Sequence, residues 1–344
     1  MNYRNIFKMF TREDLEELEI KKLSPRAQYS SESRGRRDPE KLCKFRMIFQ
    51  QDRDRIIHSK SFRRLKHKTQ VFISPMGDHF RTRLTHTLEV SQISRTIARS
   101  LGLNEDLTEA IALAHDLGHT PFGHAGEEVL NRLSDKGFQH NHQSLRVVDK
   151  LESRNGNRFG LNLSYEVRDG ILNHTGEKLP ETLEGQIVKI ADRIAYINHD
   201  LDDAMRADII CLEDIPYSCI EVLGKRQSDR IDIMVKDIIS TSSKSDIIKM
   251  SDEVDKVTNK LRDFLFNNVY IGSEAKVEEE KAQKLLERLY FHYYEKPEAM
   301  PSEFYERIDK EGKEQAVIDY IAGMTDRYAI NQGRELFIPS SSFF

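Results

Sequence analysis

The sequence predicts an all-α protein. Three observations favour this class: helix-forming charged residues are abundant (charged residues make up 32%), only 9 Pro and 17 Gly occur in 344 residues, and apolar residues recur with the helical period. Many good helix formers and few helix breakers are typical of helical domains. Strand-like runs are scarce and short. A chain of this length can also bury a sizeable core.

The composition disfavours several classes of protein. The net charge of −4 argues against a nucleic-acid coat protein. No apolar run approaches the roughly 20 residues that span a bilayer, so we expect no membrane attachment. The first residues lead directly into charged sequence, so we expect no signal peptide. Three cysteines without a Cys-x-x-Cys pair are typical of a reducing compartment, and we therefore expect a cytoplasmic protein.

We expect three regions: an N-terminal arm (1–54), a helical core (55–215) and a C-terminal helical region (216–344). The arm is polar, is broken by Ser, Gly and Pro, and contains one short helix near 12–23. Residues 53–68 hold seven Lys or Arg against one acid, Asp54. Two interpretations of this basic stretch stay open: a solvated helix face, or a surface for phosphates that would include single-stranded nucleic acid.

The helical period is clear from Leu84 onward. Gly102 is a natural stop for the first of these helices, and Asn104 is a natural cap for the second. The expected helices cover 84–101, 104–118, 125–133, 141–151, 166–173 and 184–205, and beyond Pro216 a series of charged amphipathic helices includes 274–289 and 314–326.

Histidine is unevenly placed along the chain. Nine of the 12 His lie between His58 and His142. His115 and Asp116 are adjacent at the end of an expected helix, just before Gly118. A lone His-Asp pair is more often a surface pair than a metal site, so further residues are needed to support a site.

Two residues on other helices support one. His86 shares a helix face with Val90 and Ile93, so it is either a core histidine or a rigidly held ligand. Asp192 lies on an apolar face of the 184–205 helix, where an unpaired charge would be costly and a partner or a metal is needed. Two His and two Asp would form a mixed nitrogen and oxygen metal site.

The turn that follows Asp116 contains three more groups suited to proton transfer. His119, His124 and Glu127 come within eleven residues of Asp116. His124 and Glu127 are three residues apart, so they face each other on the start of a helix. A carboxylate beside a histidine fixes its tautomer and raises its basicity, as a general acid or base needs. Packing alone is a weak explanation for three His around a Gly-rich turn.

Six segments of the chain resemble the deoxyguanosine-triphosphate triphosphohydrolase (dGTPase) family of the HD-domain phosphohydrolases. His86, His115-Asp116 and Asp192 match the H…HD…D signature of the superfamily. The narrower matches are HSKSFRRLKHKTQVF (58–72), RTRLTHTLEV (81–90), HDLGHTPFGHAGE (115–127), FQHNHQS (138–144), DRIAYINHDLDDA (192–204) and DYIAGMTDRYA (319–329). The resemblance implies an HD-domain helical core with an N-terminal arm and a C-terminal helical extension. It says little about 209–313.

The resemblance also implies a reaction and a cofactor. Enzymes of this family split a dNTP into deoxynucleoside and intact triphosphate, so the expected substrate is dGTP or several dNTPs. His86, His115, Asp116 and Asp192 would hold one divalent metal ion per active site. Mg or Mn is expected to support activity, and the ligand set also accepts Zn, Ni, Fe or Co.

The remaining roles follow the same resemblance. His124, oriented by Glu127, matches the residue that supplies or removes a proton, and His119 and His140 match positions that contact the α-phosphate. The other matches concern substrate binding and fall on Gln70, Arg83, Arg193, Tyr196 and Asp200. The two arginines would reach phosphate oxygens, or else form surface salt bridges. Tyr196 and Asp200 would recognise the deoxyribose together with Gln70, although plain core packing also explains Tyr196.

The resemblance implies a homo-oligomer, and some members of the family are activated by a dNTP at a subunit interface. Neither the preferred base nor an effector site can be read from the residues. Two other functions stay open at this point. One is a 5′-nucleotidase acting on dNMPs, which would not need the 118–127 segment and its arginine partners. The other is a nucleotide- or single-strand-binding protein that uses the basic stretch, which gives no reason for His124 and Glu127.

Overall fold

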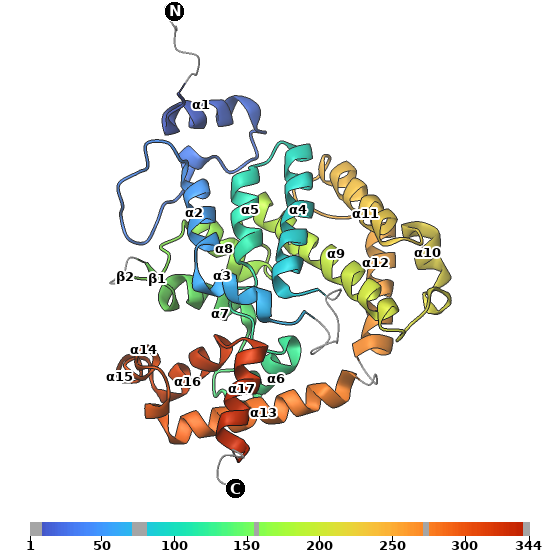
Figure 1. Cartoon of the computed structure of the whole chain (residues 1–344). Helices are drawn as coiled ribbons and strands as arrows, with labels where there is room; N and C mark the ends of the chain where they lie inside the picture. The colour runs from blue at the N-terminus through green and yellow to red at the C-terminus, as the bar shows by residue number, and fades with distance from the viewer. Residues whose placement is uncertain (1–8, 71–80, 155–157, 271–274, 340–344) are drawn as a thin grey trace, which may run out of the picture.

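The computed structural model describes residues 9–70, 81–154, 158–270 and 275–339, and their regular secondary structure is almost entirely helical (Figure 1). This confirms the expected all-α class. Within the described part, the exception is an antiparallel pair of two-residue strands, β1 (Ser153–Arg154) and β2 (Arg158–Phe159). The helices are α1 Arg12–Lys22, α2 Ile48–Ile57, α3 Lys60–Arg64, α4 Arg83–Leu101, α5 Glu105–Ala114, α6 Gly123–Leu133, α7 His140–Arg146, α8 Tyr165–Asn173, α9 Leu183–Arg206, α10 Tyr217–Leu223, α11 Gln227–Ser242, α12 Asp252–Leu265, α13 Ala275–Glu295, α14 Ser302–Tyr305, α15 Ile308–Glu311, α16 Lys313–Ala322 and α17 Asp326–Phe337.

Local sequence signals set the ends of the helices that carry the site. α4 ends at Gly102, which adopts a left-handed conformation with φ of 67°. The side chain of Asn104 accepts a hydrogen bond from the backbone N–H of Leu107 and caps α5. Thr182 caps α9 in the same way through the N–H of Gly185. The stop and the cap expected at Gly102 and Asn104 are therefore present.

One hydrophobic cluster joins α4, α5 and α9 with the helices around them. Ile97, Leu107 and Ile194, one from each of the three, are fully buried in it. The cluster includes Phe49 and Ile56 of α2, so α2 crosses the expected end of the arm at residue 54 and packs with the core. It also runs through the C-terminal region as far as Val269.

A second hydrophobic cluster holds α6 against the end of the chain. It combines Val129 and Leu130 of α6 with residues of α13, α16 and α17, among them Leu286, Ile321 and Ala329. Figure 1 shows these C-terminal helices gathered around α6, away from α9. α6 therefore lies between the two parts of the molecule, although it belongs to the central segment of the sequence.

The end of the chain departs from the expected single helix over 314–326. α16 stops at Ala322, and a separate helix, α17, begins at Asp326. Thr325 explains the restart, because its hydroxyl accepts a hydrogen bond from the N–H of Tyr328 and caps α17. Among the described residues, no helix is long and apolar enough to cross a membrane.

Candidate active site

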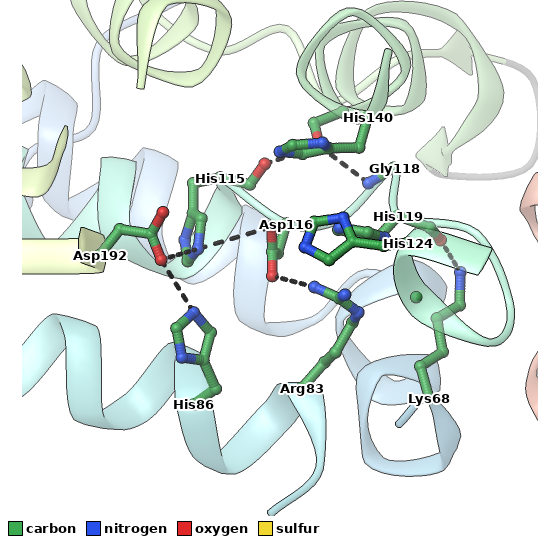
Figure 2. Close-up of polar contacts among 12 residues, drawn as sticks. Lys68, Arg83, His86, His115, Asp116, Gly118, His119, His124, His140 and Asp192 are labelled. Atoms are coloured by element: carbon green, nitrogen blue, oxygen red, sulfur yellow. Dashed lines mark hydrogen bonds and ion pairs between the residues drawn. The ribbon is translucent and has the colours of Figure 1, made fainter. Parts of the chain in front are cut away.

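Four side chains from three helices meet where α4, α5 and α9 approach each other. His86 of α4 lies 3.0 Å from Asp192 of α9, measured from Nε2 to Oδ1. His115 follows the last turn of α5, and its Nε2 lies 3.6 Å from an oxygen of Asp116 and 3.7 Å from Asp192. Figure 2 shows these side chains pointing toward one another from separate helices. We call these four residues the metal cluster.

The hydrogen bonds of the metal cluster leave a nitrogen ready to bind a cation. His115 Nδ1 donates to the carbonyl of Ala112 at 2.7 Å, so its Nε2 carries a lone pair. That Nε2 is buried and has no hydrogen-bond partner among the described residues. Such an inner hydrogen bond is typical of metal-binding histidines. His86, His115 and Asp116 place ligand atoms within 4.8 Å of one another, so the residues fit a divalent metal ion.

Charges within the metal cluster keep its carboxylates ionised. Burial raises the pKa of Asp192, but the hydrogen bond from His86 and the proximity of the His115 imidazole outweigh it and lower that pKa to about 2. Burial also raises the pKa of Asp116, and His115 and Arg83 outweigh it in turn, leaving the pKa well below its usual value. Both carboxylates are therefore available as anionic ligands near neutral pH.

Arg83 holds Asp116 in place. Its guanidinium donates to Asp116 Oδ2 at 2.6 Å, and the side chain is only 2% exposed. The same guanidinium lies beside Gly123, where an added Cβ would come within 3.2 Å of Nη2. Arg83 thus lies between the metal cluster and the turn that begins α6, and its buried charge faces both.

A second group of side chains lies on that turn and on the helices that follow it. Glu127 of α6 contacts His140 of α7, with its Oε1 3.0 Å from Nδ1, and its Oε2 lies 3.6 Å from His124 Nδ1 and 3.9 Å from His119 Nε2. The rings of His119 and His140 stack with centroids 4.5 Å apart. The side chain of His124 is 84% exposed, whereas His119 is buried. We call His119, His124, Glu127 and His140 the loop cluster.

The protonation of the loop cluster centres on Glu127. Burial raises the pKa of Glu127, but His124 and His140 outweigh it and bring the pKa far below its ordinary value. Burial lowers the pKa of His140, yet the bond to Glu127 outweighs it and leaves that pKa raised. For His119, burial and the nearby charge of Arg83 both lower the pKa. Glu127 therefore stays ionised beside histidines that differ in basicity.

Close backbone contacts fix the turn that carries the loop cluster. A Cβ on Gly118 would come within 2.1 Å of the backbone nitrogen of Ser144, so only glycine allows α7 to approach this closely. Phe122 adopts a left-handed conformation with φ of 60°. Its backbone N–H donates to Asp326 Oδ1 at 2.9 Å, and the other oxygen of Asp326 accepts from the N–H of Thr69 at 2.8 Å. The C-terminal region therefore holds this turn directly.

The expected substrate-binding residues Gln70, Tyr196, Asp200 and Arg193 differ in their surroundings, and one of them is engaged elsewhere. Gln70 is half-buried, and its Oε1 has no hydrogen-bond partner among the described residues. Tyr196 and Asp200 follow Asp192 along α9; Asp200 is buried, and burial raises the pKa of Tyr196 to about 12. Arg193 binds Asp255 at 3.1 Å and Asn259 at 2.7 Å on α12, so its guanidinium is engaged there and not with the clusters.

Most cations of the basic stretch 53–68 bind groups of the chain itself. Arg53 pairs with Asp106 and Glu109, and Arg55 with Glu40. The stretch therefore includes part of the internal ion-pair network. Lys60 and Lys66 are exposed.

Three residues near the clusters escaped the sequence argument. His174 follows α8 and is buried, with its Nε2 3.1 Å from His140 Nε2. Lys68 is buried and donates to the carbonyls of His119 and Ala322, and burial lowers its pKa to about 7. Asp326 holds the turn as described. Lys68 lies in the segment HSKSFRRLKHKTQVF and Asp326 lies in DYIAGMTDRYA. Both segments resemble the dGTPase family, so the sequence offered a signal for these two residues. His174 lies in neither segment.

Comparison with known proteins agrees with this geometry. The HD domain family model matches residues 83–197, which contain the metal cluster, and a phosphohydrolase-associated domain model matches 248–335. A deoxyguanosinetriphosphate triphosphohydrolase-like protein of Caldanaerobacter subterraneus subsp. tengcongensis is 59% identical over 97% of this chain and 98% of its own length. The chain belongs to the dGTPase-like family of HD-domain phosphohydrolases.

Other dGTPase-like relatives also match almost the whole chain. The proteins of Desulfatibacillum aliphaticivorans and Clostridium perfringens strain 13 are each 49% identical over 96% of this chain, and the match covers 99% and 98% of their own lengths. A crystal structure of a hypothetical protein from Aquifex aeolicus shares the fold, with a TM-score of 0.50 over 84% of this chain and 68% of that one, at 18% identity. The HD-domain core and associated C-terminal region expected from the resemblance are therefore confirmed.

Proposed function

We propose that this protein is a metal-dependent dNTP triphosphohydrolase that converts dGTP, or several dNTPs, to deoxynucleoside and triphosphate. The observation that carries the proposal is the position of the loop cluster directly beside the metal cluster, with buried Arg83 between them. The names of the curated relatives point to the same activity.

In this proposal the metal cluster holds the ion that activates the phosphate. His86, His115, Asp116 and Asp192 would hold one divalent ion, with Mg or Mn active and Zn, Ni, Fe or Co compatible with the ligand set. When bound, such an ion acts as a Lewis acid toward a phosphoryl oxygen. Arg83 adds a fixed positive charge for the anionic substrate.

The loop cluster supplies the proton transfer. Hydrolysis at the α-phosphorus breaks the bond to O5′, and the departing alkoxide needs a proton. His124 is the exposed member of the cluster, and Glu127 beside it stabilises the protonated imidazole. We therefore assign to His124 the role of donating or accepting this proton, and to Glu127 the role of orienting the imidazole ring. His119 and His140 lie behind it and face the α-phosphate in this proposal.

Residues along α9 and before the 71–80 segment complete the substrate site in this proposal. Tyr196 and Asp200 would accept the deoxyribose, together with Gln70, whose free Oε1 can accept a hydrogen bond from a hydroxyl. Arg193 would reach the phosphates only by leaving Asp255 and Asn259. Assembly as a homo-oligomer, activation by a second dNTP, a cytoplasmic location and a secondary affinity for single-stranded nucleic acid remain part of the proposal. The expected boundaries of the core, at residues 54 and 215, also remain part of the proposal.

Product analysis tests the function. The protein is incubated with each of the four dNTPs and Mg²⁺ or Mn²⁺, with and without a second dNTP, and the phosphate products are separated. We expect deoxynucleoside and triphosphate in equal amounts. Release of pyrophosphate or orthophosphate alone would reject the proposal, and orthophosphate from dNMPs alone would indicate a 5′-nucleotidase.

A further inference from the structure

Lys68, the last cation of the basic stretch 53–68, joins three parts of the molecule around the site. Its backbone carbonyl accepts a hydrogen bond at 3.0 Å from the N–H of Arg83, at the start of α4. Its side-chain nitrogen donates to the carbonyl of His119, on the turn that carries the loop cluster. The same nitrogen donates to the carbonyl of Ala322 at 2.9 Å, at the end of α16. Figure 2 shows the side chain extending to the turn beside His119.

The ring of His119 has few contacts of its own to hold it. Its Nδ1 has no hydrogen-bond partner among the described residues, and its Nε2 lies 3.9 Å from Glu127, too far for a hydrogen bond. The ring stacks on His140. The backbone N–H of His119 donates to the carbonyl of Asp116 at 3.1 Å. Apart from the stacking, the ring is therefore positioned through its backbone, and Lys68 holds the carbonyl of that backbone.

The contacts of Lys68 are kept in spite of a desolvation cost. The side chain is only 2% exposed. Burial lowers the pKa of Lys68 to about 7, although the charges of Asp326 and Asp116 oppose this change. The end of α16 offsets part of the cost, because the last carbonyls of a helix carry partial negative charge. Arg64 donates to the next of these carbonyls, that of Gly323, at 3.2 Å. A costly buried cation at this point favours a specific role over incidental packing.

We propose that Lys68 is a positioning residue of the active site. By tying the carbonyl of His119 to the end of α16 and the start of α4, it sets the position of the His119 imidazole relative to the metal cluster. The ligands of the metal cluster lie on helices of the first hydrophobic cluster and do not depend on this contact. The effect on turnover rests on the proposed function, in which His119 faces the α-phosphate, whereas the effect on the position of the ring does not.

A cavity beside Lys68 makes a sharp experiment possible. The cavity has a volume of about 40 Å³, and Lys68, Arg64 and Gly118 are among the residues that line it. Lys60 and Glu303 also line it and are exposed, so the cavity lies next to the surface. Shortening Lys68 to Ala would extend the cavity to the place of the lost nitrogen. A small primary amine can then enter, and its ammonium group meets the same two carbonyls.

Kinetics of two variants test the role. Lys68→Ala leaves room for propylamine, which replaces the atoms removed, and Lys68→Met fills that room without an N–H. Both should lower kcat by about 10–10²-fold with KM and metal content little changed, since small misplacements of reacting groups are costly. Propylamine should restore about tenfold in kcat to Lys68→Ala and nothing to Lys68→Met. Propanol, which carries no positive charge, should restore neither.

The matched control is Lys66→Ala, an exposed lysine two residues earlier, which should keep the kcat of the wild type. Wild-type kcat in folded Lys68→Met would overturn the proposal, as would loss of metal together with activity. Equal effects of propylamine and propanol would overturn it as well. Circular dichroism checks the fold; if neither variant folds, Lys68 serves the whole fold and the proposal is wrong.

A readout that needs no activity separates this proposal from the proposed function. Imidazole nitrogens are observed by nuclear magnetic resonance in histidine-labelled protein, and His119→Gln identifies the signals of His119. Lys68→Ala should shift these signals, and propylamine should move them back. Shifted signals without any release of triphosphate by the wild type would reject the function and leave the positioning role standing. Unshifted signals with intact release of triphosphate would reject the positioning role alone.

Discussion

The metal cluster and the loop cluster lie side by side but are held in different ways. The metal cluster is carried by α4, α5 and α9, whose apolar faces belong to the first hydrophobic cluster. The loop cluster lies on a turn and on the first residues of α6 and α7. Its support comes from the second hydrophobic cluster and from Lys68 and Asp326, which connect the turn to the C-terminal region.

This difference separates two requirements of the site. Long packed helices fix ligand positions rigidly, as a metal site needs. A turn held by a few backbone hydrogen bonds leaves His124 exposed to solvent. Changes in the metal cluster should therefore remove metal and activity together, whereas changes in the loop cluster or its C-terminal support should reduce activity and leave the metal in place.

Asp192→Asn should have the largest effect. The substitution removes the negative charge that lies 3.0 Å from His86 and 3.7 Å from His115. We expect loss of bound metal and a fall in turnover of roughly 10⁴-fold, since Lewis-acid stabilisation is worth several kcal/mol. Metal analysis and kinetics measure both. Asp202→Asn, on the same helix, is the control and should keep the metal; full metal occupancy in Asp192→Asn would remove Asp192 from the cluster.

His124→Ala should distinguish the role of the loop cluster from that of the metal cluster. We expect kcat to fall by about 10²–10³-fold, as for loss of a general acid or base, with metal content unchanged. Thermal stability should hardly change, because the side chain is 84% exposed. His142→Ala, an exposed histidine on α7, serves as the control and should remain active. Loss of metal from His124→Ala would instead make His124 a ligand, and the distinction between the clusters would fail.

How far the sequence predicted the site depends on how each residue is placed. His86 and Asp192 could be found because they lie at regular positions on helices whose period is visible in the sequence. His174 could not, because it stands outside every recognised segment and reaches His140 only through the packing of α7 and α8. Arg193 follows Asp192 directly, yet one residue of helical rotation turns it toward α12.

The fold shows the same limit. The helices of the core were predictable from caps and periodicity, and so was the all-α class. The hydrophobic cluster that α6 shares with α13, α16 and α17 was not, because it joins segments more than 140 residues apart. The restart at Asp326 was also missed, although Thr325 is a cap signal, because the apolar pattern was followed across Gly323.

Asp326→Ala tests whether the C-terminal region supports only the loop cluster. The carboxylate accepts the N–H groups of Phe122 and Thr69, and its removal leaves both without this partner. Each loss should cost about 1–3 kcal/mol of unfolding free energy. Because Phe122 precedes α6, His124 should shift, and we expect kcat to fall about tenfold with metal content unchanged, since small misplacements of reacting groups are costly. Denaturant unfolding, metal analysis and kinetics measure these effects.

Asp309→Ala, an exposed acid of the same region, is the control. Loss of metal from folded Asp326→Ala would show that the two clusters share their support.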